Sequence, residues 1–170
     1  MMLYAISDDY ITYLLKTDAR VMFNKDGRPY LGVVLKIDGQ NWYVPLSSPK
    51  EDAGLKPSFV WLYAIYEAGV NSKINGYLFF RNMIPAPDCA VSLFDFQSKG
   101  ASYENLINKQ HIVLKSDADK IAKDANTFYK LIIGKRSEEL LKKSCDFQKL
   151  TAACAAYKCP GVVEANQKVV

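Results

Sequence analysis

A pair of hydroxyl groups next to a cation is the set of residues in this sequence best suited to chemistry. Ser47 and Ser48 are followed by Pro49 and Lys50, and Arg28 lies earlier in the chain. Hydroxyl and ammonium groups can donate hydrogen bonds to a phosphate or an oxyanion, and a guanidinium adds a two-pronged contact. Taken as a pattern alone, the commoner explanation is a polar turn at a strand end with a solvated lysine.

Motifs for other kinds of catalysis are missing from the sequence. It contains no glycine-rich phosphate loop, no His-Glu-x-x-His, no EF-hand loop and no Gly-x-Ser-x-Gly elbow. The only histidine, His111, has no orienting partner nearby in sequence, and we interpret it as structural or surface-exposed. No Cys-x-x-Cys pair occurs among Cys89, Cys145, Cys154 and Cys159, so we expect no zinc, no other metal and no cofactor.

Two strands joined by a tight turn would position the hydroxyl pair. Residues 30–37 are rich in β-branched side chains, and Asp38-Gly39 separates them from a second run, residues 42–44. Asp-Gly between two such runs predicts a β-hairpin. The second strand leads directly into Ser47, and Pro49 favours an extended conformation at Ser48. The hydroxyl groups would therefore lie at a strand end.

The remaining elements predict one α+β domain over residues 1–170, with a twisted antiparallel sheet and surrounding helices. Ser7 is a suitable N-cap for a first helix, and further strands are expected at residues 58–66, 74–80 and 90–94, the first of which could instead be a short buried helix. Helices are then expected over residues 103–114, 118–133, 137–143 and 147–157, and residues from about 161 as a loose tail. Strands grouped before helices favour an antiparallel sheet over alternating βαβ units.

Composition and charge fit a globular protein with an anionic partner. The 170 residues are 49% hydrophobic and 24% charged, and the net charge of +4 lies entirely in residues 101–170. No apolar run is long enough to cross a membrane, and no signal peptide precedes Asp8 and Asp9. We therefore expect a cytoplasmic protein with reduced thiols.

Several segments, taken in order, resemble one known family. They are residues 4–14, 32–39 and 43–50, followed by Asn82-Met83-Ile84-Pro85, Lys109-Gln110 and Cys145-Asp146-Phe147. Over residues 3–157 the sequence resembles the ToxN/AbiQ family, the protein toxins of type III toxin–antitoxin systems.

This resemblance implies a sequence-selective, metal-independent endoribonuclease with a compact fold similar to that of the Kid/MazF-type toxins. It also implies an RNA antitoxin, made of short repeats folded as pseudoknots, that blocks the active site and is processed by the toxin. Toxin and antitoxin would form a hetero-oligomer, with cellular or phage RNA as substrates. The implied roles are locus maintenance and abortive infection against phage.

Within the resemblance, the family's catalytic hydroxyl corresponds to Ser48, its neighbouring hydroxyl to Ser47, its lysine to Lys50 and a basic residue to Arg28. Two features depart from the family. Asn24 stands where one relative has an active-site tyrosine, and the histidine that many relatives carry just beyond the lysine is missing.

The chemistry of RNA cleavage fits these residue types. RNA breaks when its 2′-oxygen attacks the adjacent phosphorus in line, which leaves a 2′,3′-cyclic phosphate and a 5′-hydroxyl. An enzyme must align the backbone, neutralise phosphate charge and move two protons. Lys50 and Arg28 would supply the charge, and Ser48 would donate to a phosphate oxygen or relay a proton. Because an unperturbed serine hydroxyl is too weakly acidic to be a base alone, we assign no general base.

Basic and aromatic side chains would hold the RNA that the resemblance implies. The candidate phosphate contacts are Arg81, Lys109, Lys115, Lys120 and Lys123, and the candidate stacking platforms are Tyr30, Trp42 and Tyr103. For each lysine a solvated helix face is the commoner explanation, and for each aromatic side chain a place in the core is at least as common.

Two other functions remain open at the level of sequence. The protein could be a non-catalytic module that binds structured RNA, with the serines only positioning phosphates. It could also be a Ser–Lys hydrolase, although Lys50 would need a desolvated site that a predicted exposed loop does not offer.

Overall fold

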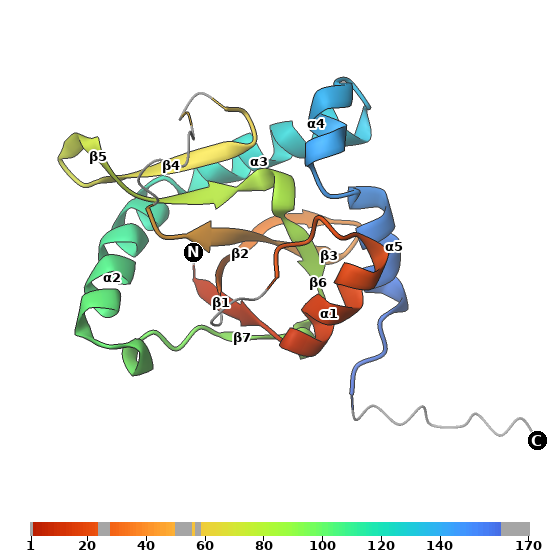
Figure 1. Cartoon of the computed structure of the whole chain (residues 1–170), viewed down its shortest axis with the longest axis horizontal. Coiled ribbons are helices and arrows are strands. Elements are labelled where there is room, and N and C mark those ends of the chain that lie inside the picture. The colour runs from red at the N-terminus through yellow and green to blue at the C-terminus, as the bar shows by residue number, and fades with distance from the viewer. Residues whose placement is uncertain (1, 24–27, 50–55, 57–58, 161–170) are drawn as a thin grey trace, which may run out of the picture.

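The computed structural model describes residues 2–23, 28–49, 56 and 59–160. In this part of the chain, seven strands form one sheet in the order β4-β5-β3-β2-β1-β7, and β6 pairs with β3 beside that path. Every strand pairing is antiparallel. One α-helix lies between β1 and β2, the other α-helices follow the last strand along the chain, and the helices pack around the sheet (Figure 1). The predicted α+β class is therefore confirmed.

The predicted hairpin is present. Strands β2 (Pro29–Ile37) and β3 (Gln40–Ser47) are joined by Asp38 and Gly39, which have φ angles of 50° and 78°. Consecutive positive φ angles at Asp-Gly are typical of the tight turn whose twist matches two antiparallel strands.

The two strands after the hairpin are present, but their bounds differ from the predicted ones. Strand β4 (Leu62–Glu67) begins four residues after the start of the predicted strand at residue 58, and β5 (Val70–Phe79) begins four residues before residue 74. Phe59 and Trp61, just before β4, are aromatic residues of high strand propensity, but their rings stack on each other ahead of the strand. Together β4 and β5 form a hairpin at one edge of the sheet (Figure 1).

Three short strands complete the sheet. The strand β7 (Val91–Leu93) falls within the predicted range, whereas β1 (Leu3–Ile6) and β6 (Ile84–Ala86) were not predicted. Pro85, in the middle of β6, and Pro87, just after it, argue against a strand, because proline cannot donate a main-chain hydrogen bond. Pro85 is tolerated because β6 is a short strand that pairs only with β3, where Pro85 lies opposite Trp42.

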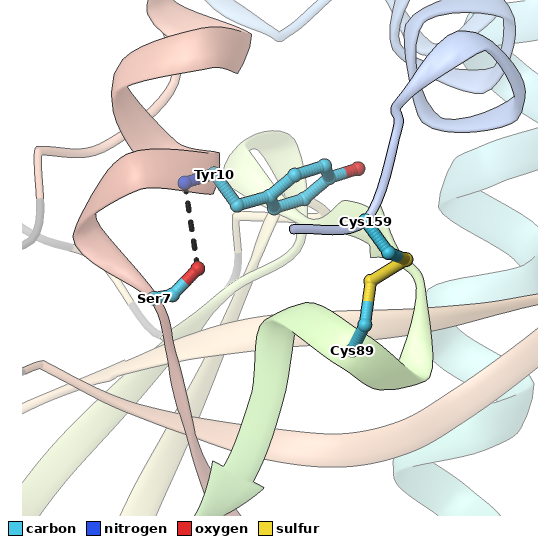
Figure 2. Close-up of a disulfide and its surroundings, with 4 residues drawn as sticks. All are labelled: Ser7, Tyr10, Cys89 and Cys159. Atoms are coloured by element: carbon cyan, nitrogen blue, oxygen red, sulfur yellow. Dashed lines mark hydrogen bonds between the residues drawn. A yellow bond between two sulfur atoms is a disulfide. The ribbon is translucent and has the colours of Figure 1, made fainter. Parts of the chain in front are cut away.

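The helices confirm most of the predicted boundaries. They are α1 (Asp8–Thr17), α2 (Ala101–Ser116), α3 (Ala118–Ile133), α4 (Glu138–Lys143) and α5 (Phe147–Ala156). Ser7 caps α1, with its hydroxyl accepting from the Tyr10 N–H at 3.4 Å (Figure 2). Asp146 caps α5 by accepting from the Lys149 N–H at 3.1 Å. The exception is α2, which begins two residues before the predicted start at residue 103 and ends two residues after residue 114, with Gly100 in the N-cap position.

The core contains two of the residues considered as RNA-stacking platforms. Tyr30 and Trp42 are both 0% exposed. Trp42 makes edge contacts with the rings of Tyr129 and Phe147, at centroid distances of 5.4 and 5.3 Å. Neither ring presents a face to a base, so the assignment of Tyr30 and Trp42 to RNA stacking is wrong.

A disulfide joins two segments that lie far apart in sequence. Cys89 lies in the short 3-10 helix η2 (Asp88–Ala90), and Cys159 lies just after α5. The two sulfur atoms are bonded close to Tyr10 of α1 (Figure 2). The expectation that all four thiols are reduced therefore fails for this pair, because their 70-residue separation hides a proximity that only the folded chain creates. Cys145 and Cys154 are free and buried.

None of the helices in the described ranges is long and apolar enough to span a membrane. The predicted loose tail, from about residue 161, lies outside the described residues.

Candidate active site

The hydroxyl pair lies where β3 leaves the sheet. Ser47 is the last residue of β3 and is 7% exposed, whereas Ser48 is exposed. The Ser47 hydroxyl donates to the Ser48 carbonyl oxygen at 3.2 Å. The prediction that these side chains lie at a strand end is confirmed. The strand fixes Ser47 and presents Ser48 to solvent.

Arg28 approaches this strand end from β2. Tyr30 pairs with Pro45, so the antiparallel register brings Arg28 level with Ser47. Burial raises the pKa of Tyr30 and of Tyr103, and the positive charge of Arg28 works against both shifts. Arg28 therefore lies within electrostatic reach of both the start of β2 and the first turn of α2.

On its other side, the end of β3 pairs with β5. Leu46 lies opposite Leu78 and Ser47 opposite Tyr77. Cross-strand partners share a face of the sheet, so Ser47 lies on the same face as Tyr77. Tyr77 belongs to a second apolar cluster that lies outside the main core and includes Leu62 and Phe79.

Two of the predicted site residues cannot be placed. Lys50 and Asn24 both lie outside the described residues. The described part of the site consists of Ser47, Ser48 and Arg28.

Arg81 forms an aromatic stack that the sequence did not predict. Its guanidinium carbon lies 4.0 Å from the ring centroid of Trp61. The ring of Phe59 stacks on Trp61 at 4.8 Å, and Phe79 lies nearly parallel to Trp61 at 6.4 Å. Because Tyr77 follows Phe79 at 6.3 Å, the stack connects with the face that carries Ser47. The signal in the sequence was the alternation of aromatic residues at Phe59 and Trp61, which we interpreted as part of a strand.

The candidate lysines differ in their surroundings. The Lys109 ammonium binds Glu67 Oε1 at 2.9 Å, and Lys73 binds Glu67 Oε2 at 2.7 Å. These hydrogen bonds lower the pKa of Glu67, so Lys109 has a carboxylate partner. By contrast, Lys115, Lys120 and Lys123 are exposed and form no salt bridge with any described residue.

A groove of about 410 Å³ separates β4 from α3. Lys120, whose ammonium lies 5.3 Å from the ring centroid of Tyr63, lines it together with Asp124 and Phe128. Across the described ranges there is no group of three or more histidine, cysteine or acidic side chains that could hold a metal.

Comparison with known proteins identifies the family. Residues 2–155 match the family described as "Toxin ToxN, type III toxin-antitoxin system". The chain is 36% identical to endoribonuclease ToxN of Bacillus thuringiensis subsp. kurstaki, over 91% of this chain and 83% of the relative. It is 31% identical to endoribonuclease AbiQ of Lactococcus lactis subsp. lactis, over 91% of this chain and 87% of the relative.

Solved structures agree with this result. A structure described as that of AbiQ, a lactococcal anti-phage endoribonuclease, superposes with a TM-score of 0.83 at 30% identity and covers 91% of this chain and 95% of its own. A second, described as showing selective toxin inhibition by a non-coding RNA pseudoknot, has a TM-score of 0.77 at 34% identity, over 90% of this chain and 95% of its own.

The α+β fold and these relatives place the chain among the endoribonucleases. Within that class, the chain belongs to the ToxN family, the toxins of type III toxin–antitoxin systems.

Proposed function

We propose that this toxin cleaves RNA at the end of β3, by attack of a 2′-oxygen on the adjacent phosphorus. The observation that carries the proposal is the strand register, which brings Arg28 level with Ser47 while Ser48 is exposed beside them. The exposed Ser48 hydroxyl and the Arg28 guanidinium are donors suited to the oxygens of a phosphodiester, and the Ser47 hydroxyl, which donates to the Ser48 carbonyl oxygen, would help to position Ser48.

In this mechanism, each group acts on the scissile phosphate. Arg28 neutralises charge on the non-bridging oxygens as it builds up in the transition state. Ser48 donates a hydrogen bond to a phosphate oxygen, and Lys50, which follows it in the chain, supplies a second positive charge. The products are a 2′,3′-cyclic phosphate and a 5′-hydroxyl, so no water molecule and no covalent enzyme intermediate enter the step.

The RNA strand would extend from the scissile phosphate over the stack formed by Arg81, Trp61 and Phe59. The guanidinium carbon of Arg81 already lies 4.0 Å from the centroid of an indole ring, and unpaired bases stack on such planar groups. Arg81 forms no ion pair with a described residue, so its charge is available to a phosphate. Lys115, Lys120 and Lys123 would add phosphate contacts along α2 and α3.

A folded RNA would serve as the antitoxin. Support comes from membership of the ToxN family and from the solved relative described as inhibited by a non-coding RNA pseudoknot. We infer that a repeat-derived pseudoknot covers the end of β3, forms a hetero-oligomer with the toxin and is processed by it. Anti-phage defence or locus maintenance would follow from release of the toxin in the cytoplasm.

The chemistry is tested by incubating the purified protein with a short unpaired RNA in excess EDTA. We expect cleavage, with 2′,3′-cyclic phosphate and 5′-hydroxyl ends detected by mass spectrometry. A requirement for added metal, or 5′-phosphate ends, would refute the proposed route. Labelling of Ser48 by a fluorophosphonate would point instead to a Ser–Lys hydrolase.

The site is tested by Ser48→Ala. Loss of a donor to the developing phosphate charge should lower kcat by at least about 100-fold. RNA binding, measured by gel shift with the antitoxin RNA, should change by less than about twofold, because the phosphate contacts from arginine and lysine remain. Thr12→Ala, at an exposed position in α1, is the matched control for removal of one hydroxyl. If Ser48→Ala cleaves at the wild-type rate, the active site lies elsewhere.

A further inference from the structure

The end of β3 has few attachments to the sheet. On the β2 side, the last paired residue towards the strand end is Pro45, opposite Tyr30. On the β5 side, only Leu46 and Ser47 are paired. A strand end held by so few pairs needs further contacts if a side chain just beyond it is to be placed to within a fraction of an ångström.

Gln110 of α2 supplies a contact at this point. It is 1% exposed, and its Nε2 donates to the Asn75 carbonyl oxygen of β5 at 2.7 Å. The preceding residue, Lys109, binds Glu67 of β4. Two adjacent residues of α2 therefore fasten the helix to the β4–β5 hairpin, one through a main-chain oxygen and one through a carboxylate.

The glycine next to Asn75 lets Gln110 come this close to β3. A Cβ atom on Gly76 would lie 2.3 Å from Gln110 Nε2 and 2.6 Å from the Ser47 carbonyl oxygen. Both distances are too short for any side chain to fit without a shift. The amide of Gln110 and the main chain of Ser47 thus occupy the two sides of one small space, which exists only because residue 76 has no side chain.

This arrangement is costly for stability. Gln110 Oε1 and Asn75 Nδ2 are buried and have no hydrogen-bond partner among the described residues. Buried polar atoms without partners are unfavourable, and an apolar residue of similar size would avoid one of them. Sequences keep such features chiefly at functional sites. Gln110 is therefore better explained by what it positions than by what it stabilises.

We propose that Gln110 is a positioning residue for the nuclease site, and that it holds the end of β3 through β5 so that Ser48 meets the scissile phosphate. This proposal rests on the proposed function. Gln110 itself touches no substrate. Its loss should lower the rate of the chemical step and leave the binding of RNA, which depends on more distant contacts, nearly unchanged.

The first test is Gln110→Leu, which keeps the volume and removes the amide. We expect kcat for cleavage of a short RNA to fall by at least about tenfold, with KM and the Kd for antitoxin RNA within about twofold of wild type. Ile107→Val is the control, because Ile107 is 2% exposed on the same helix but neither takes part in the hydrogen bond to Asn75 nor supplies any of the atoms nearest to a Cβ on Gly76. The control should keep the wild-type kcat.

A second variant gives a readout that general loss of structure would not produce. In Gln110→Glu, a protonated carboxyl group can donate to the Asn75 carbonyl oxygen as the amide does, whereas a carboxylate cannot. Burial raises the pKa of such a carboxyl group. The ratio of variant to wild-type kcat should therefore rise as the pH falls from about 8 to 5. Restoration of activity at low pH also shows that the variant is folded.

The outcomes separate this proposal from the proposed function. If kcat of Gln110→Leu stays within about twofold of wild type, or if kcat and RNA binding fall together with no rescue in Gln110→Glu, Gln110 does not position the site. If Ser48→Ala cleaves normally, the site on β3 is wrong whatever Gln110 does. Inactive Ser48→Ala together with active Gln110→Leu overturns only the positioning role.

Discussion

Asp18, at the end of α1, is a buried carboxylate that joins three parts of the molecule. It accepts hydrogen bonds from the main-chain N–H, Nε and Nη2 of Arg20 at 2.9, 2.8 and 2.9 Å, and from the Asp146 N–H at 2.6 Å. Asn82 Nδ2 donates to the Arg20 carbonyl oxygen at 2.9 Å. Asn82 and Asp146 belong to two of the segments that carry the family resemblance, so these segments meet around one ion pair.

This network predicts how stability depends on pH. Burial acts to raise the pKa of Asp18, but its hydrogen bonds with Arg20 and Asp146 outweigh that effect and the pKa is lowered. A carboxyl group with a lowered pKa stabilises the fold above its unfolded pKa of about 4, and this contribution is lost as the pH falls through the folded value. Asp18→Asn should lower the free energy of unfolding by about 2 kcal/mol at pH 7, and the difference should shrink below about pH 4.

Urea unfolding of wild type and Asp18→Asn at a series of pH values measures this difference. Asp119→Asn, at an exposed position in the first turn of α3, is the control for removal of a carboxylate. A difference that stayed constant between pH 7 and pH 3 would show that the charge of Asp18 contributes little.

Arg81 is expected to act on RNA affinity. Because its guanidinium combines a positive charge with a stacking plane, Arg81→Ala should weaken RNA binding by about tenfold and reduce the salt slope of log Kd by about 1. The value of kcat at saturating RNA should hold within about twofold, since the groups at the end of β3 are intact. Fluorescence anisotropy at several salt concentrations measures the slope. Lys16→Ala, which removes an exposed charge from α1, should leave the affinity nearly unchanged.

At the scale of elements, the turn between β2 and β3 allows a clean test of backbone conformation. Gly39 has a φ angle of 78°, and a Cβ atom there would meet nothing within 4 Å. Gly39→Ala should therefore destabilise the fold by about 1 kcal/mol through backbone strain alone. Gly39→Asn should cost less, because asparagine tolerates this conformation. Thermal unfolding compares the two variants. Equal losses for alanine and asparagine would show that the strain of a positive φ angle is not the cause.

Local patterns predicted these elements well where one short segment decides the outcome. The helix α3 (Ala118–Ile133) has the predicted bounds because an apolar stripe with helical spacing runs along its whole length. The Asp-Gly turn and the Ser7 cap likewise depend on a few neighbouring residues. Prediction failed where partners are distant in sequence. The strand β6 exists because β3 is there to pair with it, and nothing within Ile84–Ala86 reveals that partner.

The candidate site, too, combines features that one short segment determines with features that depend on partners distant in sequence. That Ser47 and Ser48 end a strand follows from the residues around them, and the hairpin register follows from its turn. The contact of Gln110 with β5, and the pairing of Ser47 in β3 with Tyr77 in β5, join segments that are far apart along the chain. Only the folded sheet brings them together, so a sequence pattern could single out Lys109-Gln110 without explaining it.

At the scale of the whole molecule, the chain closes on itself through its last described segment. The helix α5 packs beside α1, and Tyr157 contacts the rings of Tyr10 and Tyr13 at 4.7 and 5.0 Å (Figure 1). Two residues further on, Cys159 is bonded to Cys89. The disulfide therefore holds the segment after α5 against the segment that leads into β7. The loop that it closes contains β7 and the helices α2 to α5.

Closing so long a loop should stabilise the protein substantially. The bond links residues 70 positions apart, and the loss of chain entropy in the unfolded state for such a loop corresponds to about 4 kcal/mol. The double variant Cys89→Ser, Cys159→Ser should lose most of that amount, and reduction of wild type by dithiothreitol should have the same effect. Urea unfolding with and without reductant measures both.

The double variant also supplies the internal control. Its unfolding midpoint should not respond to dithiothreitol, whereas the wild-type midpoint should fall, because Cys145 and Cys154 are free and buried in both proteins. The rate of RNA cleavage should be equal in the two proteins under native conditions, since Cys89 lies in η2 and Cys159 just after α5, and neither residue belongs to the end of β3 or to α2. A wild-type midpoint that did not respond to reductant would mean that the bond adds no stability in solution. A change in cleavage rate with reduction would instead couple the state of the bond to the nuclease site.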